Sequence, residues 1–117
     1  MSLVSPQDPL AVFFALAVLH ALADFPLQGE YLAKQKVREN ADGTSEWIVA
    51  LFAHSLIHAG AVWLVTGSKL LGIVELVLHA GIDAAKGKGR FGLLTDQALH
   101  LGCKMIYVVA VYQNWVR

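Results

Sequence analysis

The stretch "ELVLHAGIDAAK", residues 75–86, places Glu75, His79 and Asp83 at intervals of four in an otherwise apolar segment, with Lys86 just beyond. Four residues is little more than one turn of an α-helix, so these three side chains line one face of a single helix. In apolar surroundings an ionisable face is very costly unless it faces the interior of a bundle and finds partners there. The stretch therefore predicts a helical bundle with a polar interior.

The whole chain is unusually apolar for its length. Of its 117 residues, 56% are hydrophobic and only 15% are charged, whereas ordinary soluble domains contain about 25% charged residues. This composition favours a membrane protein, and a soluble bundle of buried helices is the alternative. The nine Lys and Arg balance nine Asp and Glu and form no broad basic face, so we expect no nucleic-acid partner.

Four apolar segments are separated by polar or Gly- and Pro-containing joints, and they cover roughly residues 10–25, 47–66, 70–86 and 93–115. The second and fourth reach the ~20 residues needed to cross a bilayer, while the first and third are nearer ~15 and need flanking residues or local thinning. Residues 1–9 contain no Lys or Arg, so we expect the first segment to be retained and not cleaved as a signal peptide. We predict an all-α, integral membrane four-helix up-down-up-down bundle that forms one domain over residues 1–117.

Basic residues are concentrated in two of the joints. Lys34, Lys36 and Arg38 lie between the first two segments, and residues 86–90 supply two lysines and an arginine between the last two. By the positive-inside rule these joints are cytoplasmic and both termini lie outside. We therefore expect a multi-pass protein of a cytoplasmic membrane, with the lipid bilayer as its partner and its oligomeric state open.

Each predicted helix carries polar side chains four residues apart, and all five histidines of the chain belong to these sets. The sets are His20 and Asp24; His54 and His58; Glu75, His79 and Asp83; and Asp96 and His100. In an up-down-up-down bundle all four sets fall in the cytoplasmic halves of the helices. With a rise of about 1.5 Å per residue, one histidine from each helix falls at a common depth. The aspartates are expected one turn nearer the cytoplasm, and His58 and Glu75 one turn deeper.

Imidazole and carboxylate groups from facing helices are ligands that suit zinc, iron or manganese. An unligated carboxylate, Glu75 or Asp96, would act as general base toward a water whose pKa the metal lowers. Lys86 and Gln28 are placed to orient an anionic head group. We predict that one or two divalent ions (Zn, Mn or Fe) are bound by residues drawn from His20, Asp24, His54, His58, His79, Asp83 and His100.

Individual members of these sets also have purely structural interpretations. Asp96 is placed to stabilise a helix N-terminus, and Asp24 to cap exposed amides at a helix end. A neutral His58 could bond to Glu75, and Lys86 could be a lysine that reaches from an apolar segment to the membrane interface. The convergence of four sets at one depth favours a functional polar site over these separate explanations.

Four blocks of the chain form a distinctive series: "HALADFPLQGEYLAKQK" (20–36), "HSLIHAG" (54–60), "LHAGIDAAK" (78–86) and "DQALHL" (96–101). In this order they resemble the signature blocks of an uncharacterised membrane family of bacteria and their phages, domain of unknown function 3307, over about residues 10–110. The resemblance implies a bacterial inner membrane and adds Gln97 to Gln28 and Lys86 as polar positions that we expect to contact substrate. Glu75 has no counterpart in these motifs, so its role rests on geometry alone.

The His and Asp pattern of this family is similar to that of small membrane proteins regarded as metal-dependent hydrolases, which is an analogy and not a mechanism. The leading hypothesis is a membrane-embedded metal-dependent hydrolase that acts on a lipid-borne or amphipathic phosphoester or ester near the cytoplasmic face. A proton or metal-ion transporter is an alternative that the apolar outer halves of the helices disfavour. A nonenzymatic phage-related membrane interaction protein and a b-type haem protein also stay open, although an acid beside nearly every histidine disfavours haem.

Overall fold

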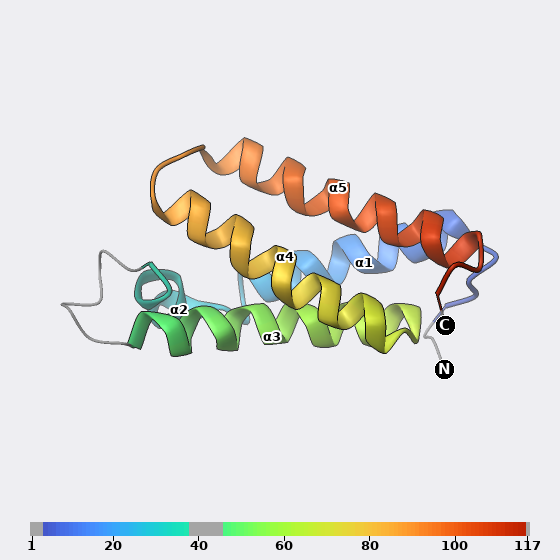
Figure 1. The fold of residues 1–117 in the computed structure, drawn as a ribbon, viewed down its shortest axis with the longest axis horizontal. Helices are drawn as coiled ribbons and strands as arrows, with labels where there is room; N and C mark the ends of the chain where they lie inside the picture. The colour runs from blue at the N-terminus through green and yellow to red at the C-terminus, as the bar shows by residue number, and fades with distance from the viewer. Residues whose placement is uncertain (1–3, 38–45, 117) are drawn as a thin grey trace.

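Five α-helices make up the described part of the chain, residues 4–37 and 46–116 of a computed structural model, and these ranges contain no strand. The helices are α1 (Pro9–Asp24), α2 (Gly29–Gln35), α3 (Glu46–Thr66), α4 (Lys69–Gly87) and α5 (Leu93–Tyr112). Four of them are long rods that form an elongated bundle, and the short α2 packs against α3 (Figure 1). The all-α fold class is confirmed.

The predicted number of helices needs one correction. The first basic joint contains α2, a helix of seven residues that the apolar pattern does not predict because the segment is short and polar. Pro26 follows the end of α1, and Gly29, with a φ of 68°, turns the chain at the start of α2. At the other end of the chain, α5 stops at Tyr112 and does not continue to residue 115, since Asn114 adopts a φ of 66°.

Local hydrogen bonds explain where two of the long helices, α1 and α4, begin. Asp8 caps α1 by accepting a bond from the Ala11 amide at 3.0 Å, and Pro9 occupies the first helical position. Ser68 caps α4 in the same way, with the Leu71 amide 3.1 Å from its hydroxyl. The turn between α3 and α4 is therefore only two residues long, as the Thr-Gly-Ser sequence at 66–68 indicates.

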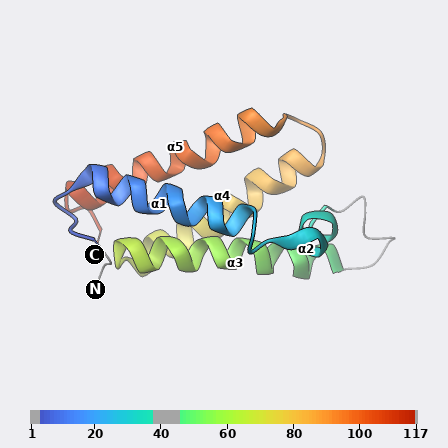
Figure 2. The ribbon, with the colours of Figure 1, turned by 180° about the vertical axis from the view of Figure 1, so that it is seen from behind.

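The connections alternate between the two ends of the bundle. Helix α2 and residues 88–92, which join α4 to α5, lie at one end (Figures 1 and 2). The turn at 67–68, the start of α1 and the end of α5 lie at the opposite end. Lys34, Lys36 and the basic residues of 86–90 are therefore at the same end, whereas Arg38 lies outside the described residues. We call this end the basic end.

The interior of the bundle divides into two parts of opposite chemistry. An apolar half-core lies toward the turn at 67–68 and consists of Val12, Leu16, Val62, Val65, Leu71, Tyr107, Val108 and Val111. A polar half-core lies toward the basic end and contains the buried or half-buried residues His20, Asp24, His54, His58, Glu75, His79, Asp83, Asp96, Gln97, His100 and Lys104. The helices that position the two parts are the same.

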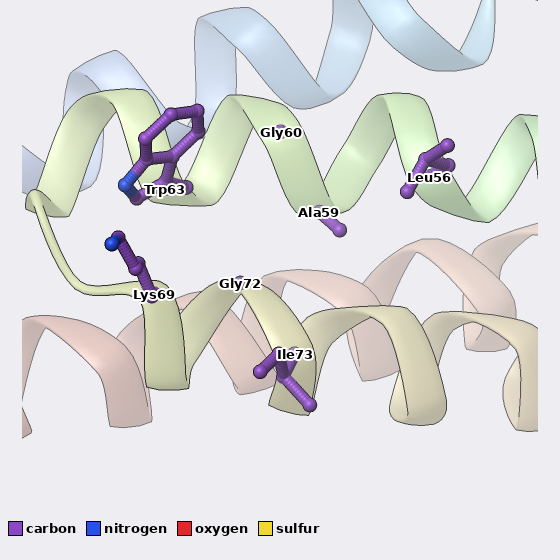
Figure 3. Close-up of a pocket in the computed structure, with 7 residues that line it drawn as sticks. All are labelled: Leu56, Ala59, Gly60, Trp63, Lys69, Gly72 and Ile73. Atoms are coloured by element: carbon purple, nitrogen blue, oxygen red, sulfur yellow. The ribbon is translucent and has the colours of Figure 1, made fainter.

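Helices α3 and α4 approach most closely near their shared turn. A Cβ atom at Gly72 would lie 3.2 Å from the Ala59 carbonyl oxygen and 3.3 Å from the Trp63 Cβ, so the absence of a side chain permits this approach. Figure 3 shows the outward-facing pocket of about 400 Å³ that is left beside the contact. Its lining is almost entirely apolar, with Lys69 beside Trp63 near the turn.

The expectation of four membrane-spanning helices is not confirmed. Among the described residues, α3 alone combines the length and the hydropathy needed to cross a membrane, and α1 is apolar but shorter. Helix α4 includes Glu75, Asp83 and two lysines, and α5 includes Asp96 and Lys104. These charged residues lower the hydropathy of α4 and α5, although the carboxylates and Lys104 are buried inside the bundle.

Candidate metal centre

Histidine rings from all four long helices lie together in the polar half-core. The ring centroids of His58 and His79 are 3.7 Å apart, and those of His79 and His100 are 4.2 Å apart. His20 lies 5.2 Å from His100, and His54 lies 4.8 Å from His58. Each of the five is at most 3% exposed. The predicted convergence is present, but His58 belongs to the same cluster and not to a separate deeper layer.

Asp24 joins the end of α1 to α3 and α5. Its Oδ1 lies 2.9 Å from His58 Nε2 and 3.2 Å from His54 Nε2. Its Oδ2 lies 3.3 Å from His20 Nε2 and accepts a hydrogen bond of 2.9 Å from Gln97 Nε2. The carboxylate therefore faces the histidines and does not cap the helix end, and His58 is paired with Asp24 and not with Glu75.

Asp83 occupies the middle of the cluster. Its Oδ2 lies 3.4 Å from both His54 Nε2 and His79 Nε2, while its Oδ1 lies 3.3 Å from His100 Nε2. The same Oδ2 accepts a hydrogen bond of 2.7 Å from Lys36 Nζ, which reaches in from the residue that follows α2. The helix that the apolar pattern does not predict thus brings a cation into the centre.

Asp96 lies in the first turn of α5, but its side chain is turned into the core. Its Oδ1 lies 3.2 Å from His100 Nε2, without hydrogen-bond geometry. Its Oδ2 accepts hydrogen bonds from Gln97 Nε2 at 2.9 Å and from Lys86 Nζ at 3.4 Å. Asp96 therefore contacts the centre directly. It does more than stabilise the N-terminus of α5, which is the purely structural interpretation of its position.

Glu75 closes the polar half-core on the side of the apolar half-core. Its Oε2 accepts a hydrogen bond of 2.7 Å from Lys104 Nζ and lies 3.3 Å from His79 Nδ1. Its Oε1 accepts a bond of 2.8 Å from the Tyr107 hydroxyl. Both oxygens are therefore engaged by buried partners, so the geometry favours a role in orienting His79 over the predicted role as general base.

Three residues that build this centre are absent from the predicted site. Lys104 could have been found, because it continues the four-residue spacing of Asp96 and His100 along α5. Tyr107 follows one turn later, but a tyrosine in an apolar segment carries no comparable signal. Lys36 could be recognised only once its neighbouring helix was known.

The donor atoms fit one or two divalent ions. In each of three groups the ligand atoms all lie within 4.8 Å of one another, and the groups are Asp24, His54, His58 and His79; Glu75, His79 and His100; and Asp83, Asp96 and His100. In the described part of the chain, both ring nitrogens of His54 and the Nε2 of His79 are buried and have no hydrogen-bond partner. An imidazole nitrogen with a free lone pair beside carboxylate oxygens is the donor set that zinc, iron and manganese take. His20 belongs to none of the three groups and instead lies 3.0 Å, Nε2 to Oε1, from Gln97.

A pocket of about 310 Å³ opens beside this centre at the basic end, and it is lined by Gln28, Ala33, Lys36, Val37, Asp83, Lys86 and Gly87. Two of the residues predicted to contact substrate, Gln28 and Lys86, therefore lie in one pocket with a carboxylate of the centre. Gln97 lies outside the pocket lining and bonds to Asp24 and Asp96. Its position indicates that it orients these two carboxylates.

Comparison with known proteins gives a family match but no activity. The family described as "Protein of unknown function (DUF3307)" matches residues 12–117, which include all of the centre described above. No curated protein and no solved structure matches the chain. Any chemistry must therefore be argued from the residues themselves.

Proposed function

The chain belongs to the DUF3307 family of proteins of unknown function, and we propose that it is a membrane-embedded, metal-dependent hydrolase of phosphoesters or esters carried by lipid or amphipathic molecules. The observation that carries the proposal is the set of buried imidazole nitrogens that lack hydrogen-bond partners and lie beside carboxylate oxygens. His54 is the clearest case, because its Nε2 is 3.2 Å from Asp24 and 3.4 Å from Asp83 and the residue is 0% exposed. A divalent cation would take the lone pair of one nitrogen from each imidazole together with the neighbouring carboxylate oxygens.

Two of the three groups of possible ligands share no residue. One ion would be held by Asp24, His54, His58 and His79, and a second by Asp83 and His100, while the neighbouring Asp96 stays unligated. Asp83 faces both groups, since its two oxygens contact histidines of each. His20 and Gln97 hold Asp24 in position from the outside of the cluster. When bound, a divalent ion supplies a Lewis acid that makes water nucleophilic near neutral pH.

Within this centre, Asp96 is the better placed of the two carboxylates that sequence suggests as general base. Its Oδ1 is buried and has no hydrogen-bond partner in the described part of the chain, so it has a free site for a proton taken from water. Glu75 is held by Lys104 and Tyr107 and acts by orienting His79.

The outer surface of the bundle supports a place in the lipid bilayer. Large apolar side chains on all four long helices point outward, and Phe14, Val49, Val77, Leu94 and Ile106 are each between 64% and 87% exposed. A water-soluble bundle would bury such residues and expose its charges, which is the reverse of this distribution. The buried charges of α4 and α5 face the bundle interior, as charges within a membrane must. We place the basic end at the cytoplasmic face of a bacterial inner membrane, with both termini outside.

Transport is less well supported than hydrolysis by the same residues. The chain of polar contacts runs from the basic end to Lys104 and Tyr107. Beyond them lie the buried valines and leucines of the apolar half-core, in which an ion or a proton would find no partner.

The experiment that tests this function uses the full chain purified in a mild neutral detergent, stripped with a chelator and reloaded with Zn, Mn or Fe. Hydrolysis of chromogenic phosphoesters and carboxylic esters in mixed micelles is expected to require metal. The Asp96→Asn variant should lose roughly 10²- to 10⁴-fold in rate, the usual worth of a general base. Lys69→Met, at the opposite end of the bundle, is the matched control and should hydrolyse normally. If none of the three metals changes the melting temperature or produces hydrolysis, the proposed function is wrong.

A further inference from the structure

We propose that the pocket between α2 and α4 binds the phosphate group of the substrate through Lys36, Lys86 and Gln28, so that the enzyme acts on phosphomonoesters and not on carboxylic esters. This inference rests on the proposed function and narrows its substrate class. It depends on three features of the pocket: two cations beside the centre, an unpaired acceptor, and a volume that suits a small head group.

The two lysines bring positive charge to the edge of the centre from two separate elements. The Lys36 side chain is 14% exposed and lies 2.7 Å from Asp83, while the Lys86 side chain is 38% exposed and lies 3.4 Å from Asp96. An ammonium group has three N–H donors, and each lysine is seen to use one of them for a carboxylate. The remaining donors can hold phosphate oxygens directly beside Asp83, which lies in the same pocket lining.

This arrangement discriminates between the two ester classes. A phosphomonoester carries one or two negative charges before it reacts, and partly buried ammonium groups bind such oxygens by charge-assisted hydrogen bonds. A carboxylic ester is neutral and would gain little from two lysines at the entrance. The pocket therefore favours substrates that arrive as anions.

Gln28 adds a second kind of recognition. Its Nε2 donates to the Asp24 carbonyl oxygen at 2.9 Å, which fixes the orientation of the amide. Its Oε1 is buried and has no hydrogen-bond partner in the described part of the chain. Because Gln28 also lines the pocket, this oxygen can accept a hydrogen bond from the P–OH group of a singly protonated phosphomonoester, whereas a phosphodiester has no such group.

The size of the pocket indicates which part of the substrate it holds. A volume of about 310 Å³ is at the lower end of the ~300–1,000 Å³ typical of small-molecule sites. The pocket therefore takes the phosphate and its immediate substituents. Leu27, the residue before Gln28, is 60% exposed and lines a separate apolar pocket with residues of α1 and α3, which suits the tail.

The reaction that follows is a simple hydrolysis. The oxygen of a water molecule forms a bond to phosphorus, and the bond between phosphorus and the ester oxygen breaks. Asp96 takes a proton from the water, and the leaving alcohol oxygen gains a proton in return. The products are an alcohol with its apolar tail and inorganic phosphate, and no oxidant, reductant or further reactant is needed.

The inference can be tested by binding alone, with decylphosphonate as a non-hydrolysable phosphomonoester analogue and calorimetry on the metal-loaded full chain in neutral detergent. Lys36→Met and Lys86→Met should each raise the Kd roughly tenfold or more, because each removes a hydrogen bond to a charged group. Lys88→Met is the matched control, since Lys88 is exposed in the same basic joint and outside the pocket lining. If Lys36→Met lowers the melting temperature, Lys86→Met, whose ion pair is longer and more exposed, still tests the pocket.

The outcomes separate this inference from the proposed function. Equal Kd values for Lys36→Met, Lys86→Met and Lys88→Met would overturn the phosphate pocket, even if carboxylic esters were hydrolysed. Tight and lysine-dependent binding of decylphosphonate without hydrolysis of any ester would support the pocket and contradict the hydrolase. If inorganic phosphate bound with the same lysine dependence while decylphosphonate did not bind, the site would take free phosphate and the inference of an ester substrate would fail.

Discussion

The polar half-core and the apolar half-core are built by the same four helices, yet they hold opposite kinds of side chain. In the polar half-core, five imidazoles and four carboxylates from the four long helices contact one another. In the apolar half-core the contacts are between valines and leucines, with Tyr107 at the boundary. Apolar packing stabilises a bundle without any ligand, whereas buried charges must be compensated. The apolar half-core therefore holds the helices together without a ligand, whereas the polar half-core is stable only if each of its charges is compensated.

Two of the pockets show the same contrast at the surface. The pocket of about 310 Å³ at the basic end contains two lysines, a glutamine and an aspartate. The pocket of about 400 Å³ in Figure 3 is lined mainly by apolar residues and faces away from the bundle. The first suits a charged group beside the centre, and the second suits an apolar ligand.

The largest expected effect on stability comes from the boundary between the halves. Lys104→Met leaves Glu75 charged, buried and without its cation, which should reduce the free energy of unfolding by about 3–5 kcal/mol. Equilibrium unfolding in mild detergent measures this loss. The double variant Glu75→Gln/Lys104→Met removes both charges and should recover much of it. A double variant no more stable than Lys104→Met would show that the ion pair is not the cause.

A cavity in the apolar half-core should destabilise the fold without affecting the centre. Leu16 is 2% exposed, so Leu16→Ala should reduce the free energy of unfolding by roughly 3 kcal/mol. Leu10→Ala, the same substitution on α1 at a residue that is 77% exposed, should have little effect. Metal content by elemental analysis should be the same in both variants and in the wild type. Loss of metal from Leu16→Ala would mean that the two halves are not separate.

Removing the hydroxyl of Tyr107 is expected to have a smaller effect on the contact between the two half-cores. Tyr107→Phe keeps the ring in the apolar half-core but removes the hydrogen bond to Glu75 Oε1. Hydrogen bonds to charged groups contribute about 1.5–3 kcal/mol, so a loss of about 2 kcal/mol is expected in the same unfolding measurement. Because Lys104 stays in place, metal binding should persist. An unchanged stability would mean that Glu75 does not depend on this bond.

The smallest effect is expected at the far end of the apolar half-core. Ser68→Ala removes the cap that accepts the Leu71 amide at the start of α4 and should reduce the free energy of unfolding by about 1 kcal/mol. Ser68→Thr, whose hydroxyl can form the same cap without burying a charge, is the control and should retain most of the stability. A larger loss, or any change in metal content, would show that this turn contributes to the centre.

Much of this arrangement follows from sequence, because helical spacing is a local property. The apolar segments and their breaks locate the four long helices, with Ser68 and Pro9 at the starts of two of them. The four-residue spacing identifies the histidines and carboxylates that meet in the polar half-core. Their convergence follows because an alternating bundle brings all four sets to one end.

The remaining features depend on how each helix is rotated and on parts of the chain with weak local signals. The apolar pattern does not reveal α2, so it also misses Lys36, which bonds to Asp83. The spacing of residues along α3 does not predict whether His58 contacts Asp24 or Glu75. The observed contact with Asp24 depends on how α1 is rotated relative to α3. Lys104 lies in a segment that is otherwise apolar. A single charge in such a segment is a weak signal, although Lys104 is four residues from His100.

The measurement that tests the central claim most directly is the metal content of the detergent-purified full chain, compared between the wild type and His79→Ala. His79 belongs to two of the three ligand groups, so its loss should affect binding more than that of any peripheral residue. We predict one or two tightly held divalent ions per wild-type chain and the loss of at least one from His79→Ala, with Leu16→Ala unchanged. A wild-type chain that holds no stoichiometric metal after exposure to Zn, Mn and Fe, or a His79→Ala chain with wild-type content, would contradict the metal centre.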